Sequence, residues 1–301
     1  MEFGLLSHLT NDTRFLDKAL KIREFLRKHE RPDSGIYYNF IHPETGAWGR
    51  TLHASVGALG DSFYEYLIKT YLLTAKTDTI AKNMYEDALR GIKNVLLKNG
   101  PGNHWYLGEL KRTRTEAKMG HLTCFAGGMF ALGAKHTSEE KYWLEKAIQL
   151  GETCRLSYSQ SPIGIGPESF RFDNEKDAGK AKMKNEKYYV LRPEVIETYF
   201  YLWRYTKDQR WRDYGWEAAQ AIDKHCRVEG GFSGIKDVTA DKLVLDDTQQ
   251  SFLLAETFKY LYLLFSDDDL IDLNEWVFNT EAHPFKILPF IDSAKETELI
   301  A

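Results

Sequence analysis

The sequence predicts an all-α domain in which pairs of helices repeat along the chain and close into a toroid. Three segments place an acidic residue before a run of aromatic and aliphatic residues, beginning at Glu65, Glu197 and Glu256. Each is typical of a largely buried inner helix. Short polar breaks such as residues 206–210 contain residues that cap helix N-termini. The pattern recurs about every 55–70 residues, which favours a closed toroid over a linear solenoid.

The expected elements follow from this pattern in chain order. Residues 1–6 resemble the end of an inner helix. Further inner helices are expected near residues 61–74, 121–134, 193–205 and 247–265. Outer helices, in which charged and apolar residues alternate at helical spacing, are expected at about 12–29, 79–98 and 207–226. Links rich in glycine and aromatic residues are expected to form short strands or hairpins at 34–38, 103–107 and 230–234.

The composition excludes several classes of protein. The 301 residues are 43% hydrophobic, enough for one large domain, and the net charge of −4 without a basic run argues against nucleic acid as a partner. No apolar stretch approaches the roughly 20 residues of a membrane span. The cysteines Cys124, Cys154 and Cys226 lack metal-site spacing, and at most one pair can form.

Two glutamates stand three residues apart at the start of one expected inner helix. Pro193 suits the first turn of a helix, so Glu194 and Glu197 should lie near the N-terminus on one face. Acidic residues in this place most often offset the helix dipole. Carboxylates aimed into a shared cavity are also typical of catalytic sites, and the residues alone leave both interpretations open.

Six motifs add to this pattern. They are Gly-Ala-Leu-Gly-Asp-Ser-Phe-Tyr-Glu-Tyr at 57–66, His-Leu-Thr-Cys-Phe at 121–125, Gly-Pro-Glu at 166–168, Leu-Arg-Pro-Glu at 191–194, Ser-Phe-Leu-Leu-Ala-Glu at 251–256 and Phe-Asn-Thr-Glu-Ala-His-Pro at 278–284. In this order they resemble glycoside hydrolase family 47, the class I α1,2-mannosidases that trim N-glycans. The resemblance implies an (αα)7 barrel, which agrees with the helix-pair repeat.

The extent of the resemblance implies a domain organisation. Residues 1–285 would be the C-terminal two-thirds of a single catalytic domain, and residues 286–301 a tail without a counterpart. Because the pattern opens within a unit, we expect the chain to lack the first units, the general acid usually assigned in the family and an N-terminal membrane anchor. The incomplete toroid would expose apolar surface, so we expect the chain alone to fold poorly and to be inactive.

The resemblance implies a calcium-dependent, inverting hydrolase. The catalytic carboxylates map onto Asp61 and Glu194, with Glu168 as a further acidic residue that is sometimes assigned the acid role. An inverting enzyme holds its acid and base about 6.5–9.5 Å apart, which leaves room for the attacking water. Since Asp61 and Glu194 both begin inner helices, this arrangement is feasible.

Calcium would be held by Thr280, through its hydroxyl and carbonyl oxygens, and oxygen ligands suit so hard a cation. The resemblance gives four glutamates the role of orienting the calcium-bound waters: Glu194, Glu197, Glu256 and Glu281.

Other matched residues are expected to bind substrate. Phe252 would pack against a sugar ring, Arg192 would fork onto sugar hydroxyls or hold a carboxylate, and His121 would hydrogen-bond the substrate. Glu256 and Glu281 would also contact the sugar. Without the resemblance, Phe252 reads as a core residue, Arg192 as half of an ion pair and His121 as a structural histidine.

Two further matches concern specificity and compartment. Leu59 stands where Golgi members of the family resemble one another in having Leu and endoplasmic-reticulum members in having Arg, which implies a Golgi-type enzyme with room for several glycan branches. Cys124 and Cys154 match the family's disulfide, which implies an oxidising lumen.

The predicted function is therefore that of a mannosyl-oligosaccharide 1,2-α-mannosidase, a monomer acting on high-mannose N-glycans of glycoproteins. Three alternatives stay open: a catalytically weak glycan-binding relative, an inactive fragment, and a helical-repeat scaffold. The acidic residues at the starts of the inner helices argue against the scaffold.

Overall fold

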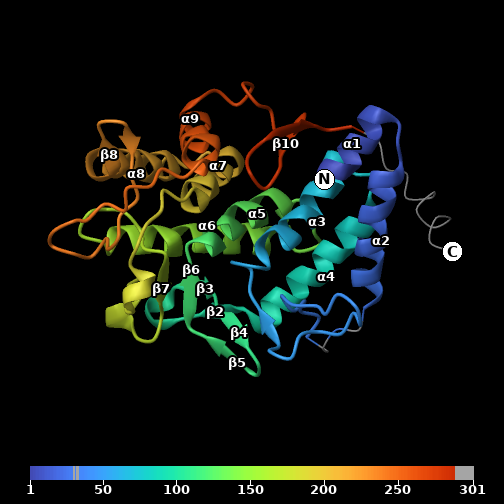
Figure 1. Ribbon diagram of the computed structural model, residues 1–301, viewed down its shortest axis with the longest axis horizontal. Helices are drawn as coiled ribbons and strands as arrows, with labels where there is room; N and C mark the ends of the chain where they lie inside the picture. The colour runs from blue at the N-terminus through green and yellow to red at the C-terminus, as the bar shows by residue number, and fades with distance from the viewer. Residues whose placement is uncertain (30, 32–33, 289–301) are drawn as a thin grey trace. The chain divides into compact units, whose positions relative to one another are not determined.

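The computed structural model describes residues 1–29, 31 and 34–288, so most of the tail expected at 286–301 lies outside the described residues (Figure 1). The chain divides into two compact units. The first comprises Met1–Tyr37, Ser62–Asn94 and Ile271–Ala301, and the second Tyr38–Asp61 and Val95–Leu270.

The first unit is built from helices and one hairpin. Its elements are α1 (Glu2–Thr10), α2 (Arg14–Lys28), nearly all of α3 (Asp61–Leu73) and α4 (Thr79–Val95), and the antiparallel pair β10 (Trp276–Phe278) and β11 (Pro284–Lys286). Helix α1 is followed by its C-cap Asn11, whose left-handed φ of 54° is a conformation that asparagine tolerates well. The side chain of Asp78 accepts the N–H of Ala81 at 2.9 Å and so caps the start of α4.

The second unit combines helices with short strands. Its strands are β1 (His53–Ala54), β2 (Leu97–Asn99), β3 (Trp105–Leu107), β4 (Glu109–Lys111), β5 (Arg114–Glu116), β6 (Lys118–Gly120), β7 (Ser169–Arg171), β8 (Arg227–Val228) and β9 (Gly231–Phe232). Its longer helices are α5 (Phe125–Ala134), α6 (Glu140–Ser159), α7 (Glu194–Thr206), α8 (Arg210–Cys226) and α9 (Lys259–Phe265). Short 3₁₀ turns are η1 (Pro101–Asn103), η2 (Leu122–Cys124), η3 (Glu175–Asp177) and η4 (Lys184–Glu186), and η5 (Leu253–Phe258) is a π-helix.

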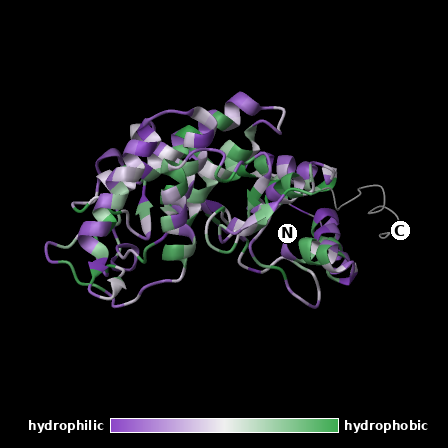
Figure 2. Ribbon diagram, turned by 90° about the horizontal axis from the view of Figure 1, so that it is seen from above, coloured by the Kyte–Doolittle hydropathy of each residue, from purple (hydrophilic) through white to green (hydrophobic). Residues whose placement is uncertain are grey.

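Helix α5 forms the centre of the second unit. Every one of its residues is buried, and it packs against α6 and α7 (Figure 1). Two glycines permit this approach: a Cβ on Gly127 would lie 2.6 Å from Cγ2 of Thr198, and a Cβ on Gly128 would lie 2.7 Å from Cδ2 of Tyr201. Most helices elsewhere carry both hydrophobic and hydrophilic residues, as expected where one face is buried (Figure 2).

The strand pairs bring distant parts of the second unit together. Strands β1, β4 and β5 form one small sheet, and β2–β3, β6–β7 and β8–β9 are antiparallel pairs. The pairing of Gly120 with Ser169 in β6–β7 places the residues beside them, His121 and Glu168, next to each other.

The mostly helical fold confirms the expectation from the repeat, and barrel closure stays a prediction. The inner helices expected near 61–74, 121–134 and 193–205 and the expected outer helices are all present, as are strands in the links at 103–107 and 230–234. The prediction of a strand at 34–38 was wrong, because these described residues are irregular and Gly35 turns with a φ of 80°.

The helix expected over 247–265 begins only at Leu253, and its first turn is a π-helix. The preceding residues are engaged elsewhere. The Gln249 side-chain oxygen accepts the N–H of Phe232 at 2.8 Å, and Asp246 accepts the N–H of Thr248 at 3.0 Å. These loop hydrogen bonds compete with helix formation.

Candidate active site

The candidate site of the second unit centres on the start of α7. Pro193 is the N-cap and Glu194 the first helical residue. Leu191, just upstream, is fully buried with a φ of 65°, an uncommon conformation for a non-glycine residue. The Thr257 hydroxyl donates to the Leu191 carbonyl at 2.7 Å and so helps to fix this turn. The position of Glu194 is therefore set by a strained, hydrogen-bonded turn.

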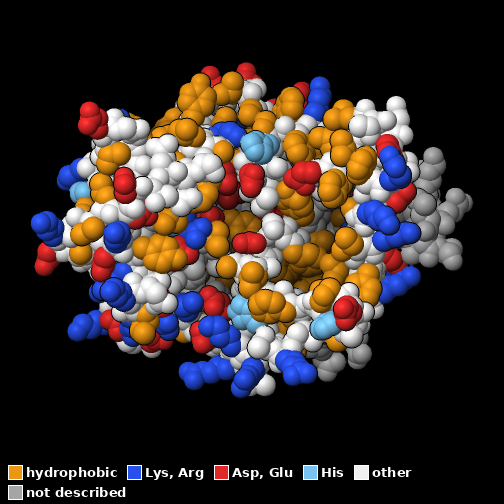
Figure 3. Space-filling view, in the orientation of Figure 1, with side chains coloured by type: hydrophobic (Ala, Val, Ile, Leu, Met, Phe, Trp, Pro, Cys, Tyr) orange, Lys and Arg blue, Asp and Glu red, His pale blue; other side chains and the backbone are white. Residues whose placement is uncertain are grey.

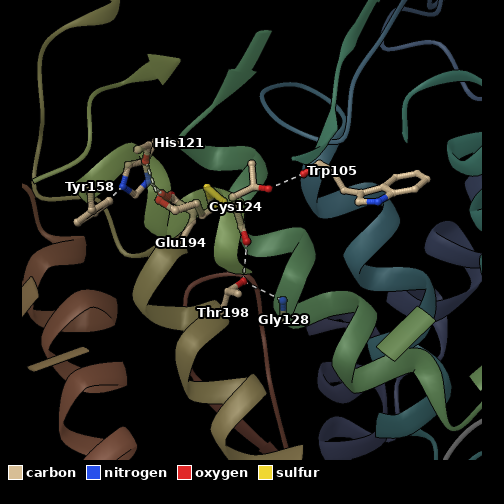
Figure 4. Close-up of a disulfide and its surroundings, with 10 residues drawn as sticks. Trp105, His121, Cys124, Gly128, Tyr158, Glu194 and Thr198 are labelled. Carbon is tan, nitrogen blue, oxygen red and sulfur yellow. Dashed lines mark hydrogen bonds and ion pairs between the residues drawn. A yellow bond between two sulfur atoms is a disulfide. The ribbon is translucent and has the colours of Figure 1, made fainter. Parts of the chain in front are cut away.

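Glu194 is paired with a histidine that the sequence placed in the substrate site. Its Oε2 lies 2.6 Å from Nδ1 of His121, and Nε2 of the same ring lies 2.8 Å from the Tyr158 hydroxyl (Figure 4). The exposed fraction of Glu194 is 8% and that of His121 is 0%. Because both ring nitrogens are engaged and the ring is buried, His121 contacts Glu194 and Tyr158 in this structure and is not exposed to solvent. Glu197, one turn further along α7, accepts a hydrogen bond from Tyr260 at 3.3 Å.

Glu168 and Arg192 form a two-pronged ion pair beside Glu194. Nε and Nη2 of Arg192 donate to the two carboxylate oxygens of Glu168 at 2.6 and 2.8 Å. The Glu168 carbonyl also accepts the backbone N–H of His121 at 2.8 Å. Both carboxylate oxygens of Glu168 therefore accept hydrogen bonds from the guanidinium, which fixes the orientation of this carboxylate.

A cleft of about 460 Å³ in the second unit includes Glu168 in its wall. Charged side chains of β4, β5, β6 and β7 and of η4 line much of it: Glu109, Lys111, Glu116, Lys118, Arg171 and Glu186. Figure 3 shows acidic and basic side chains side by side over β4 and β5. Many of them are paired, as Lys111 is with Glu116 at 2.9 Å. Such a wall offers both hydrogen-bond donors and hydrogen-bond acceptors to a ligand with many hydroxyl groups.

Asp61 and Leu59 lie on the turn that leads into α3. Asp61 is the first residue of the helix, and its N–H donates to the Gly57 carbonyl at 2.9 Å. Leu59 has a φ of 75° and is 64% exposed, so its side chain is presented to solvent. Gly60 is required here, since a Cβ would lie 2.1 Å from the Ser55 carbonyl oxygen.

The remaining predicted residues occupy two other segments. Phe252 is the N-cap of the π-helix and Glu256 lies within it, and both are partly buried. Thr280 and Glu281 are exposed on the turn between β10 and β11 in the first unit. The Asn279 side chain accepts the N–H groups of Glu281 and His283 at 3.0 and 2.8 Å and so shapes this turn.

The Thr280 turn suits a hard cation in its chemistry. The backbone N–H of Thr280 donates to the Tyr66 hydroxyl at 3.1 Å, whereas its own hydroxyl and carbonyl make no hydrogen bond within the described residues. These two oxygens are the kind of ligand that calcium prefers. No group of three or more His, Cys, Asp or Glu side chains with metal-binding geometry occurs in residues 1–29, 31 and 34–288.

The structure confirms the disulfide between Cys124 and Cys154, with a Cα–Cα distance of 6.0 Å (Figure 4). Cys226 is a buried free thiol, and burial raises its pKa to about 12. Among the described helices, none is long and apolar enough to cross a membrane.

Tyr158, whose hydroxyl lies 2.8 Å from Nε2 of His121, is a residue of this site that the sequence did not single out. A tyrosine inside a helix carries no local signal of a contact with a distant histidine.

Comparison with known proteins shows the family of this chain. Residues 1–287 match the profile of glycosyl hydrolase family 47, and the chain belongs to this family. It is 55% identical to mouse mannosyl-oligosaccharide 1,2-alpha-mannosidase IB over 97% of this chain and 46% of the relative, and 50% identical to the pig IA enzyme over 96% and 44%. The chain thus spans about half the length of these relatives.

A solved structure supports the fold as well. The alpha-1,2-mannosidase from Trichoderma reesei superimposes with a TM-score of 0.84 at 31% identity, over 94% of this chain and 63% of that chain.

Proposed function

We propose that the protein to which this chain belongs is a mannosyl-oligosaccharide 1,2-α-mannosidase, which removes α1,2-linked mannose from high-mannose N-glycans with inversion. Membership of glycosyl hydrolase family 47 and relatives at 50–55% identity support this proposal. The single structural observation that carries it is the buried Glu194 carboxylate, held by His121 beside the Glu168–Arg192 pair.

In this proposal Glu194 and Asp61 are the carboxylates that serve proton transfer. A carboxylate that accepts a hydrogen bond from an imidazole suits the general base that activates water. An inverting reaction needs that base and an acid about 6.5–9.5 Å apart on opposite faces of the sugar. Glu168 and Arg192, which are tied to each other, would bind sugar hydroxyls, and Phe252 would stack against the ring.

Calcium would bind through the hydroxyl and carbonyl oxygens of Thr280, with Glu281 beside it on the same turn. When bound, the ion would position sugar hydroxyls and water. Glu197 and Glu256 would serve the same end as acceptors for the surrounding waters. The free hydroxyl and carbonyl of Thr280 support this assignment.

The compartment and the branch preference are parts of the same proposal. The disulfide is consistent with the oxidising lumen of the Golgi apparatus. The exposed side chain of Leu59 is placed to contact a glycan branch and, being apolar, would not grip one branch by hydrogen bonds. The fold would close as an (αα)7 barrel, and the protein would act as a monomer.

Proton NMR of the first-formed mannose tests the reaction. High-mannose glycan is incubated with the full-length protein and calcium, and the anomeric signals are followed before mutarotation. We expect β-mannose to appear first. Early α-mannose would contradict inversion, and binding of the glycan without any mannose release would favour the glycan-binding alternative.

A further inference from the structure

Tyr158 reaches Glu194 through His121, and the proposed function gives it no role. We propose that the Tyr158 hydroxyl is a positioning group: it fixes His121 in the tautomer with its proton on Nδ1, and that proton holds the Glu194 carboxylate. The proposal rests on the proposed role of Glu194 as a base.

The three side chains come from three segments, and His121 contacts both of the others. Tyr158 lies in the last turn of α6, His121 directly precedes η2, and Glu194 begins α7 (Figure 4). The two hydrogen bonds measure 2.8 Å at Nε2 and 2.6 Å at Nδ1. Tyr158 is 1% exposed, so bulk water cannot replace it as the partner of Nε2.

The position of the protons follows from the partners. A carboxylate can only accept a hydrogen bond, so the contact with Glu194 requires a proton on Nδ1 of His121. In the tautomer proposed here the single N–H of the ring is on Nδ1, and Nε2 accepts a hydrogen bond from the Tyr158 hydroxyl. Burial raises the pKa of Tyr158 well above its ordinary value, and the hydroxyl therefore keeps its proton and can donate it.

Two features hold the Tyr158 ring in place. A Cβ on Gly166 would lie 2.4 Å from Cε2 of Tyr158, so the ring occupies the space that any side chain at Gly166 would need. Cys154, one turn before Tyr158, is bonded to Cys124, three residues after His121. The disulfide and the Tyr158–His121 hydrogen bond thus join the same two segments, α6 and residues 121–124, one helical turn apart.

A second contact also accompanies the hydrogen bond between His121 and Glu194. Thr198, one turn after Glu194 in α7, donates to the Cys124 carbonyl at 2.6 Å and accepts the N–H of Gly128 at 2.8 Å. The segment that carries His121 is therefore joined to α6 by the disulfide and to α7 by the Thr198 hydrogen bond, in addition to the two contacts of the His121 ring itself. Without the Tyr158 hydroxyl, the ring can turn or take the other tautomer, and either change removes the Nδ1 proton from Glu194.

The variant Tyr158→Phe tests the effect on turnover in the full-length protein. We expect kcat to fall about 10- to 100-fold, because a buried ring nitrogen loses its partner, while KM stays within about twofold. Tyr199→Phe is the matched control: Tyr199 is equally buried, and its hydroxyl has no hydrogen-bond partner in the part of the chain that the structure describes. A kcat of Tyr158→Phe equal to that of the control would overturn the proposal.

A second readout does not depend on activity. Nitrogen-15 NMR of histidine-labelled protein, with the His121 signals assigned from a His121→Asn variant, reports which ring nitrogen carries the proton. We expect Nδ1–H in the wild-type protein and its loss in Tyr158→Phe. Wild-type His121 with its proton on Nε2 alone would refute the proposal, even if Tyr158→Phe failed to fold. If the wild-type protein released no mannose, the proposed function would fail, while the NMR result would still decide the part played by Tyr158.

Discussion

The start of α7 in the second unit and the turn between β10 and β11 in the first differ in how their polar atoms are used. Glu194 is 8% exposed and bonded to His121, which is itself bonded to Tyr158. Thr280 is exposed, and its hydroxyl and carbonyl make no hydrogen bond within the residues described. One region satisfies its own polar groups, and the other leaves two oxygens open.

The difference matches the chemistry proposed for each region. A group that transfers protons works best when its orientation and protonation are fixed in advance by neighbours. A cation ligand must instead keep its lone pairs available until the ion binds.

The first prediction concerns the fixed carboxylate. Glu194→Gln should lower kcat by about 10²–10⁴-fold, since an amide cannot accept a proton, while glycan binding measured by calorimetry stays largely unchanged. The exposed Glu229→Gln serves as the control. Full activity in Glu194→Gln would remove this residue from the mechanism.

The second prediction concerns the cross-link beside this carboxylate. Cys154→Ser should lower the free energy of unfolding by about 3–4 kcal/mol, because the disulfide closes a loop with a sequence separation of 30 residues. Urea denaturation measures the change. The double variant with Cys124→Ser should lose no more than the single one, and a much larger additional loss would show that the cysteines act separately.

The third prediction concerns the open turn. Thr280→Ala should remove most of the rise in melting temperature that calcium gives, because a ligand that binds only the folded state stabilises it by mass action. Melting curves with calcium and with chelator measure this, and Thr51→Ala, at another exposed threonine, is the control. An undiminished calcium shift in Thr280→Ala would place the ion elsewhere.

The fourth prediction concerns the exposed side chain of Leu59, where we expect the smallest change in activity. Leu59→Arg should change the order in which glycan branches are trimmed, because Arg adds hydrogen-bond donors to an exposed position. Stability should change by less than about 0.5 kcal/mol. Leu59→Gln, which adds a shorter uncharged donor, separates charge from polarity. An unaltered product series with Leu59→Arg would mean that this residue does not contact the branches.

The sequence predicts the features that depend on local signals. Pro193 and the acidic residues after it locate the start of α7, and periodicity locates most other helices. The contact of His121 with Glu194 spans 73 residues, and no local pattern encodes it. The late start of the helix at Leu253 was missed because a local signal misled: the sequence pattern predicts a helix from residue 247, but loop side chains such as Gln249 form other hydrogen bonds there.

The position of the disulfide along the chain also bears on the order of assembly. The cross-link joins residues 124 and 154, so His121 and the whole of α5 are already made when the bond can form. Glu194 emerges from the ribosome 40 residues after Cys154. The disulfide between α5 and α6 can therefore form before α7 has been synthesised, and the helix that bears the proposed base can then dock onto two helices that are already cross-linked.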